Sequence, residues 1–271
     1  MTDTQRQAYK IGGRAVRQVL AQRAPRTHRA LERMQSSDVV VVRGSMDHVE
    51  WVLDALGLPY LGVDASRLRQ VSLSPRQTVI VNCPGRVPAQ AIAPIRRFVE
   101  QGGRLFTTDW ALNLLEKAFP GNVRFNQRST EDEVVPVRQV PRSHPLLEGV
   151  TGGPCNPQWW LEYASHPIQV LHPGVEVLLA SWKLEERYGH DPVAVRFEHG
   201  RGDVVHMISH YYLQRTELRD ARHRAGAEAW FSELGLVPDE ELGELRLGEL
   251  ESAATSARFL ANILADKARR G

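Results

Sequence analysis

The chain has 271 residues, of which 42% are hydrophobic, enough for one large domain with a substantial core. Lys and Arg (34) nearly balance Asp and Glu (32), so the chain as a whole does not have the charge of a polyanion-binding protein. Its two cysteines, Cys83 and Cys155, form no C-x-x-C pair, which indicates neither a zinc knuckle nor a disulfide framework. No signal-peptide core and no apolar run of the roughly 20 residues that span a bilayer is found, so we expect a cytoplasmic protein without a membrane segment.

The positive charge is concentrated at the start of the chain. Residues 1–34 contain eight Lys or Arg side chains but only Asp3 and Glu32 as acids. We therefore expect residues 1–36 to form a basic helical arm. A solvated helix face is the ordinary interpretation, and binding to nucleic acid is the alternative.

From residue 38 onward, predicted strands and helices alternate. The strands are runs of buried type at 38–43, 60–63, 78–82 and 104–107. The helices follow at 45–56, with Ser45 as N-cap, at 88–101 and at 110–119. This alternation predicts parallel βαβ units with right-handed crossovers.

The second half of the chain has a different pattern. Residues 134–140 contain Pro136 and are typical of an edge strand, whereas 141–175 are rich in Pro, Gly and His and predict long surface loops. Strands at 175–182, 192–197 and 202–208 predict a β-meander, and 216–234 an amphipathic helix that packs back on the sheet. The expected fold is α/β and flavodoxin-like, a mainly parallel sheet with helices on both faces, antiparallel strands in the second half and a long C-terminal helix.

That C-terminal helix is predicted over Glu240–Arg270, where apolar residues recur at i, i+3, i+4 and i+7. A long amphipathic helix must bury its apolar stripe. Either its own domain covers the stripe, or the stripe meets a second copy or another protein.

Four segments resemble the class I glutamine amidotransferase-like superfamily. They are 79–85 (Val-Ile-Val-Asn-Cys-Pro-Gly), 95–106 (Ile-Arg-Arg-Phe-Val-Glu-Gln-Gly-Gly-Arg-Leu-Phe), 143–149 (Ser-His-Pro-Leu-Leu-Glu-Gly) and 188–210, which ends in a histidine. Their order is most similar to the branch that includes the trehalose-utilisation (ThuA-like) proteins. The resemblance covers about residues 38–234. The two terminal extensions lie outside it, so we divide the chain into a basic helical arm over 1–36, an amidotransferase-like domain over 37–236 and an amphipathic helix over 237–271.

In catalytic members of this superfamily, a cysteine stands on a strained strand-to-helix turn and a histidine after the last sheet strand acts as its base. The resemblance places that turn at 107–110 (Thr-Thr-Asp-Trp), with Asp109 as the best match for the nucleophile and Thr108 as the second. It places the histidine at His210. No Cys or Ser stands at the turn and the flanking glycines are missing. The resemblance therefore implies that the chain is not an amidotransferase.

Local sequence suggests other roles for some of these residues. Cys83 precedes a proline rather than a helix, so it lacks the helix dipole that would lower its pKa and is expected to be a buried, inert thiol. Asp109 at a helix start is typical of an N-cap. His206, four residues before His210 on the same strand face, is expected to be a satisfied sheet histidine.

Ligands of open α/β folds bind at the carboxyl ends of the strands. The candidate ligand-binding residues at that edge are Ser45, His48, Cys83, Thr108, Trp110 and Tyr211. A metal site would draw on Asp109, His210, His48 and His144, but no local ligand spacing supports one. We therefore predict no metal and no cofactor.

The tryptophans leave two interpretations open. Trp159, Trp160 and Trp182 could form an apolar wall over the site, as in sugar-binding proteins, or they could anchor the core and the loops.

Taken together, these features predict a non-amidotransferase binding or scaffold subunit of a larger assembly, which associates with a protein partner or with itself through the C-terminal helix. A small-molecule ligand at the sheet edge is a further expectation. The alternative is a hydrolase or isomerase on a small, carbohydrate-like substrate, with Asp109 and His210 as acid and base.

Overall fold

The computed structural model describes residues 2–152, 155–211 and 220–270. Its centre is an eight-stranded sheet with the order β2-β1-β3-β4-β12-β11-β10-β7. The strands from β2 to β12 in this order run parallel, and β11, β10 and β7 are each antiparallel to their neighbours. The bounds are β1 Val39–Val42, β2 Leu61–Val63, β3 Thr78–Val81, β4 Arg104–Thr108, β7 Arg138–Gln139, β10 Glu176–Ala180, β11 Pro192–His199 and β12 Gly202–Met207. The predicted fold class is confirmed.

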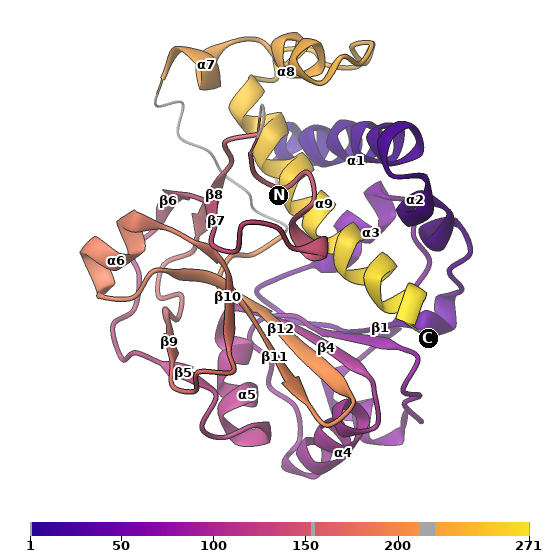
Figure 1. Cartoon of the computed structure of the whole chain (residues 1–271), viewed down its shortest axis with the longest axis vertical. Helices are drawn as coiled ribbons and strands as arrows, with labels where there is room; N and C mark the ends of the chain where they lie inside the picture. The colour runs from indigo at the N-terminus through magenta and orange to yellow at the C-terminus, as the bar shows by residue number, and fades with distance from the viewer. Residues whose placement is uncertain (1, 153–154, 212–219, 271) are drawn as a thin grey trace.

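Helices cover both faces of this sheet (Figure 1). On one side lie α4 (Ala89–Glu100) and α5 (Leu112–Ala118). On the other lie α1 (Asp3–Arg23), α3 (Val49–Ala55) and α9 (Leu247–Arg270). All four residues of β1 and all four of β3 are buried, as expected for strands that are covered on both faces. The sheet interior is therefore the centre of the hydrophobic core.

The predicted tail is α9, Leu247–Arg270, and every residue from Leu247 to Lys267 except Glu249 is buried. Its neighbours in space include α1 (Asp3–Arg23) and α2 (Pro25–Glu32), both of which pack against it. Of the two alternatives for the apolar stripe, the structure shows the one in which the chain's own domain covers it. Association with a partner or a second copy through this helix stays a prediction, and little of the α9 surface is exposed.

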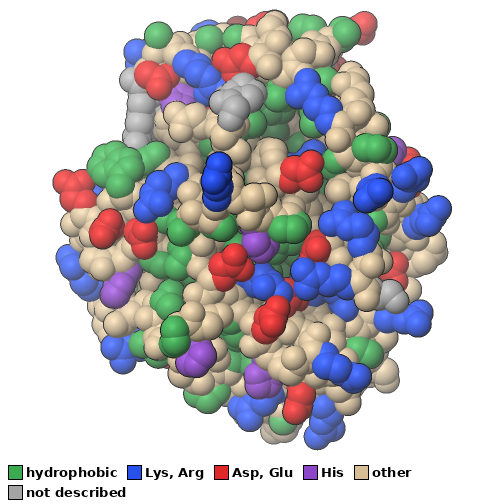
Figure 2. Space-filling model, in the orientation of Figure 1, with side chains coloured by type: hydrophobic (Ala, Val, Ile, Leu, Met, Phe, Trp, Pro, Cys, Tyr) green, Lys and Arg blue, Asp and Glu red, His purple; other side chains and the backbone are tan. Residues whose placement is uncertain are grey.

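The predicted basic arm is likewise packed on the domain through its apolar face. Arg14 forms ion pairs with Asp239 at 2.8 Å and with Glu241 at 3.1 Å, which neutralise part of its charge. Other cations, Arg26 and Arg29 among them, line a cavity of about 450 Å³ with the end of α9. Figure 2 shows Lys and Arg side chains gathered at the side where α2 and the end of α9 lie. Nucleic-acid binding by this region stays a prediction.

The region predicted as loops contains two strands instead. β8 (Gln158–Leu161) pairs with β6 (Glu133–Pro136), and β9 (Ile168–Val170) pairs with β5 (Val123–Phe125), both antiparallel and outside the main sheet. The short sequence of β8, Gln-Trp-Trp-Leu, is buried at all four positions. The predicted edge strand divides into β6 and β7, and β7 lies at the edge of the main sheet as expected.

The remaining helices also differ from the prediction. Trp182–Tyr188 forms α6, which was not predicted. The helix expected at 216–234 is two short helices, α7 (Ala221–Arg224) and α8 (Ala227–Leu234), separated at Gly226; residues 216–219 lie outside the described part. Both pack against α9 rather than the sheet, at one end of the molecule (Figure 1). Short 3-10 helices are η1 Ser36–Asp38, η2 Ala65–Gln70, η3 Asp109–Ala111 and η4 Pro145–Leu147. Among the described helices, none has the length and apolar character needed to cross a membrane.

Candidate functional site

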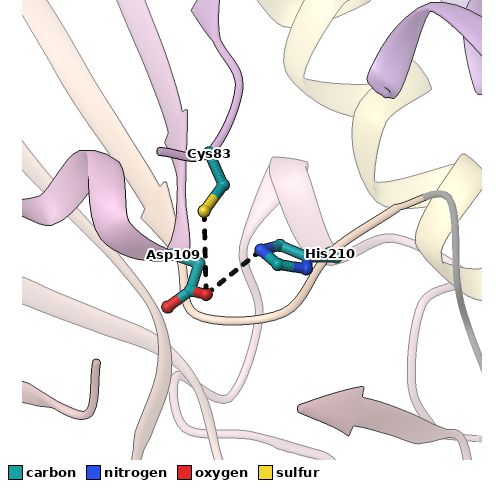
Figure 3. Close-up of side chains that lie close together, drawn as sticks. All are labelled: Cys83, Asp109 and His210. Carbon is teal, nitrogen blue, oxygen red and sulfur yellow. Dashed lines mark hydrogen bonds and ion pairs between the residues drawn. The ribbon is translucent and has the colours of Figure 1, made fainter. Parts of the chain in front are cut away.

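Three side chains from separate strands converge at the carboxyl edge of the sheet (Figure 3). Cys83 follows β3, Asp109 follows β4 and His210 lies three residues beyond β12. The imidazole Nε2 of His210 lies 3.1 Å from Oδ2 of Asp109, and the Cys83 Sγ lies 3.9 Å from the same oxygen. Each of the three residues is 1% exposed. The structure therefore brings the two predicted catalytic residues and Cys83 into one buried cluster, called the elbow cluster below.

The backbone of Asp109 has a left-handed conformation, with φ of 43°. A non-glycine residue pays about 1–3 kcal/mol for such a conformation, which persists only where the surrounding structure fixes it. The predicted N-cap role is wrong. Thr108 occupies the cap position of η3 and no side-chain cap bond is formed.

The Asp109 carboxylate accepts hydrogen bonds from the segment that follows β8. The His166 backbone N–H donates to Oδ1 at 2.9 Å, and the Ser165 hydroxyl donates to Oδ2 at 3.0 Å. With His210 and Cys83, four groups surround this carboxylate. Asp109 therefore ties the 158–166 segment to the end of β4 rather than pointing into open space.

His210 lies between two carboxylates. Its Nε2 faces Asp109 and its Nδ1 is 3.0 Å from Oε2 of Glu162. Burial lowers the pKa of His210, but the hydrogen bonds with Asp109, Cys83 and Glu162 outweigh burial and raise it well above its usual value. The raised pKa favours the imidazolium form of the ring, which lies between the buried carboxylate of Asp109 and the partly exposed carboxylate of Glu162.

Two further groups of the site were not found from the sequence. Glu162 lies directly after β8 in a stretch that the sequence presents as loop, so it carried no signal. Asp47 is fully buried and accepts hydrogen bonds from the N–H groups of His48, at 2.8 Å, and Tyr211, at 2.9 Å. Burial raises the pKa of Asp47, and the charge of His210 opposes this. Its position shortly after β1 could have indicated it, because that is where strand ends meet.

Cys83 has the environment of an inert thiol. Burial raises its pKa to about 11, so the neutral form dominates at physiological pH. The Cys83 backbone N–H donates to the Thr108 hydroxyl at 3.0 Å, so Thr108 fixes the backbone beside the thiol.

The other predicted ligand-binding residues lie around the cluster. Ser45 lines a neighbouring cavity and is not a helix cap, because α3 (Val49–Ala55) begins after His48. The His48 ring stacks on Trp51 at 4.5 Å, with its Nδ1 3.5 Å from Glu50, and does not join the cluster. Tyr211 is fully buried.

The other histidines predicted from the sequence lie outside the cluster. Nδ1 of His206 shares a hydrogen bond of 2.8 Å with the Thr107 hydroxyl, but its buried Nε2 has no partner among the described residues, so the expected satisfied sheet histidine is found only in part. Burial lowers the pKa of His206 to about 3. His144 accepts a hydrogen bond from the Leu146 N–H and lies 3.5 Å from Glu176. The metal interpretation that combined His48 and His144 with the cluster is therefore wrong.

The tryptophans do not form one wall. Trp159 and Trp160 are buried, whereas Trp182 is 56% exposed. The Trp160 ring lies edge-on to His210 at 6.2 Å and closes the cluster on that side. The core interpretation is correct for the first two.

Two cavities of about 800 and 680 Å³ lie beside the closed cluster and share the lining residues 84–86 and Trp110. The Trp110 indole donates to the Ala164 carbonyl at 2.7 Å. Its ring stacks on His166 at 5.4 Å, which in turn stacks on Phe125 at 3.9 Å. A stack of three rings, Trp110, His166 and Phe125, therefore lies next to the elbow cluster.

No family model matches the chain, and no curated protein matches it. Several solved structures are similar to the chain in fold. A glutamine amidotransferase from Thermotoga maritima is 12% identical with a TM-score of 0.52, over 87% of this chain and 99% of that one. A protein from Thermoplasma acidophilum that is described as one of the subunits of a GMP synthase is 13% identical with a TM-score of 0.48, over 66% and 86% of the two chains. A β-galactosidase from Rahnella sp. R3 is 16% identical with a TM-score of 0.42, over 64% and 28%.

The likeness to the Thermotoga maritima protein shows that this chain has the fold of the glutamine amidotransferase-like proteins. At 12% identity, the likeness concerns the fold alone. The more specific similarity to the trehalose-utilisation branch stays a prediction.

Proposed function

We propose that this chain is a non-amidotransferase binding domain built on an amidotransferase-like fold. One observation carries the proposal. At the strained turn that follows β4 stands a carboxylate, Asp109, that is buried and engaged by four neighbouring groups. Amidotransfer through a thioester needs a thiolate at that turn, and a carboxylate cannot form one.

The neighbouring thiol does not supply the missing chemistry. Cys83 is held in its neutral form by burial, and its backbone precedes Pro84 instead of starting a helix. His210 carries its proton between Asp109 and Glu162, so it is not available as a base at neutral pH. These three features support a structural role for Asp109, His210 and Glu162.

The residues that line the cavities beside the elbow cluster suit a small ligand with a flat ring and a negative charge. Trp110 lines the cavity, and one face of its ring is not covered by His166. Arg86 and Lys117 line the same cavity and have no ion-pair partner among the described residues. A ring that stacks on Trp110 would place an attached anionic group within reach of these cations.

A scaffold role in a larger assembly is part of the proposal. Because most of α9 is covered by the chain's own domain, we expect a partner to bind mainly through another surface. Light scattering after size-exclusion chromatography, on the full chain over a range of concentrations, measures whether the chain also binds itself.

The ligand proposal is tested by thermal shift with a panel of aromatic carboxylates and nucleoside phosphates. We expect a hit whose stabilisation is lost in Trp110→Ala and kept in Trp182→Ala, which removes an exposed indole away from the cavities. Stabilisation that survives Trp110→Ala, or no hit in the panel, would contradict it. Ammonia release from glutamine by the wild-type chain, lost in Asp109→Asn, would overturn the non-amidotransferase proposal.

A second candidate is a hydrolase or isomerase with Asp109 and His210 as acid and base. The observation in its favour is the left-handed turn at Asp109 beside a histidine that contacts a second carboxylate, Glu162. Strained residues cluster at active sites. This candidate requires that Asp109→Asn abolish turnover of a carbohydrate-like substrate without much loss of stability.

A further inference from the structure

The elbow cluster contains donors of three chemical kinds. They are the Cys83 Sγ, the Asp109 Oδ2 and the His210 Nε2, and all three atoms lie within 4.8 Å of one another. We propose that these residues form a binding site for a divalent transition-metal ion, with Zn²⁺ as the preferred ion. The proposal does not depend on the ligand-binding function proposed above, because it concerns the buried cluster and not the cavities.

The separations of the donor atoms suit a tetrahedral ion. Bonds of about 2.0–2.3 Å place the ligand atoms of tetrahedral Zn²⁺ roughly 3.3–3.7 Å apart. In the structure, Nε2 and Oδ2 are 3.1 Å apart and Sγ and Oδ2 are 3.9 Å apart. These two separations are therefore within a few tenths of an ångström of the tetrahedral values, and the third is at most 4.8 Å.

The surroundings of His210 match those of a metal-ligating histidine. Such a histidine usually presents its second ring nitrogen to a carboxylate, which fixes the orientation of the ring and increases its basicity. Here Glu162 lies 3.0 Å from Nδ1, on the side away from Asp109. Ser165 and the His166 N–H hold the Asp109 carboxylate in the same way. Both non-sulfur ligands are thus already oriented by outer contacts.

The donor set selects the class of metal. A thiolate with an imidazole suits Zn²⁺ and its neighbours in the first transition series, whereas Mg²⁺ and Ca²⁺ prefer oxygen ligands. Among the described residues the cluster supplies three ligands, so a fourth position remains for water or another donor.

The chain offers matched controls for both side-chain types. Cys155 is the other cysteine, also buried with a pKa raised by burial to about 11, and it stands outside the cluster. His206 is a second fully buried histidine, on the strand that leads to His210. Cys155→Ser and His206→Gln therefore remove a buried thiol and a buried imidazole without altering the proposed ligands.

The experiment titrates the full-length, metal-stripped chain with Co²⁺ and then displaces it with Zn²⁺. We expect one Co²⁺ per chain, visible d–d absorption of a tetrahedral ion and a near-ultraviolet thiolate-to-cobalt band. Cys83→Ser should abolish the thiolate band and weaken Zn²⁺ binding by about 100-fold or more, while Cys155→Ser leaves both unchanged. Glu162→Gln should keep the band and weaken binding about 10- to 100-fold.

Co²⁺ binding to the wild-type protein tests the proposal even if a variant does not fold. Absence of saturable Co²⁺ binding to the wild-type chain would overturn it. So would a thiolate band that survives in Cys83→Ser or disappears in Cys155→Ser. His210→Gln, compared with His206→Gln by circular dichroism and Zn²⁺ affinity, tests the imidazole ligand separately, and equal affinities for these two variants would also overturn it.

Discussion

Nε2 of His210 lies 3.1 Å from Oδ2 of Asp109, and both side chains are almost completely buried. Asp109 stands on a left-handed turn at the end of β4, where the sequence resemblance to the amidotransferase-like proteins places the nucleophile. A charged pair at this place holds two strand ends and the 158–166 segment together. For this pair, the structural and the catalytic interpretations predict opposite effects of substitution on stability.

Asp109→Asn is expected to lower the free energy of unfolding by about 3 kcal/mol, because it leaves the buried imidazolium of His210 with only one of its close carboxylates. Urea denaturation measures this loss. Asp64→Asn is the control, since it removes the same charge from an exposed pair with Arg43 and should cost less than about 1 kcal/mol. Equal stability of Asp109→Asn and wild type would contradict the structural role and favour the acid–base alternative.

His206 is expected to make the protein sensitive to mild acid. Its pKa falls from the ordinary 6.5 to about 3 in the folded chain, mainly because burial disfavours the charged ring. The unfolded chain therefore binds more protons between these values, and stability decreases as the pH falls below the unfolded pKa. Between pH 7.5 and pH 5 the loss should be about 2 kcal/mol.

The measurement is the urea midpoint of wild type and His206→Gln across this pH range. The variant should be less stable at neutral pH, because the hydrogen bond to Thr107 changes, but its stability should fall less steeply toward pH 5. Parallel curves for the two proteins would show that His206 is not the group that titrates.

Part of the fold could be predicted because the signal is local. Val39–Val42 and Thr78–Val81 are short apolar runs bounded by turns, and such runs are buried on both faces of a parallel sheet. β8 could not be predicted in this way, since its four residues are surrounded by Pro, Gly and His and its burial depends on pairing with β6. Pairing partners that lie far apart in the chain leave no local pattern.

The site residues also differ in whether local sequence could predict them. His210 and Asp109 follow strands and could be placed at the sheet edge from the sequence. Glu162 could not, because its contact with His210 depends on how the segment after β8 folds back over the edge. The burial of α9 was also not decidable from its sequence. Its polar side chains find partners elsewhere in the chain, as Glu251 does with Arg222.

Arg104 is expected to be essential for docking α9 on the sheet. Its guanidinium is fully buried and binds Asp203 at 2.7 Å and Asp266 of α9 at 2.8 Å. Arg104→Ala leaves two buried carboxylates without this partner and should cost about 3–5 kcal/mol by urea denaturation. Arg138→Ala, which breaks an exposed pair with Asp191, should cost less than about 1 kcal/mol. Similar losses in the two variants would show that the buried network contributes little.

The same network predicts a response to acid. Burial alone would raise the pKa of Asp203, but hydrogen bonds and charge attraction from Arg104 and Arg196 outweigh burial and lower it. The stabilisation is therefore fully present above the unfolded pKa of the carboxyl and is lost as the pH falls through the lower folded pKa. Wild type should lose stability in this acidic range, and Arg104→Ala should lose less of it.

The N-terminal helix is expected to be part of the folded domain, and two adjacent glycines of α1 test this. A Cβ on Gly13 would lie 2.4 Å from the Ala55 carbonyl oxygen of α3, whereas one on Gly12 would lie 3.2 Å from the Ala254 backbone of α9. Alanine gains up to about 1 kcal/mol over glycine within a helix. In Gly13→Ala a clash of about 1–3 kcal/mol should outweigh this gain, whereas Gly12→Ala should be close to neutral. Urea midpoints measure the difference, and a Gly13→Ala protein as stable as wild type would show that α1 does not pack closely on α3.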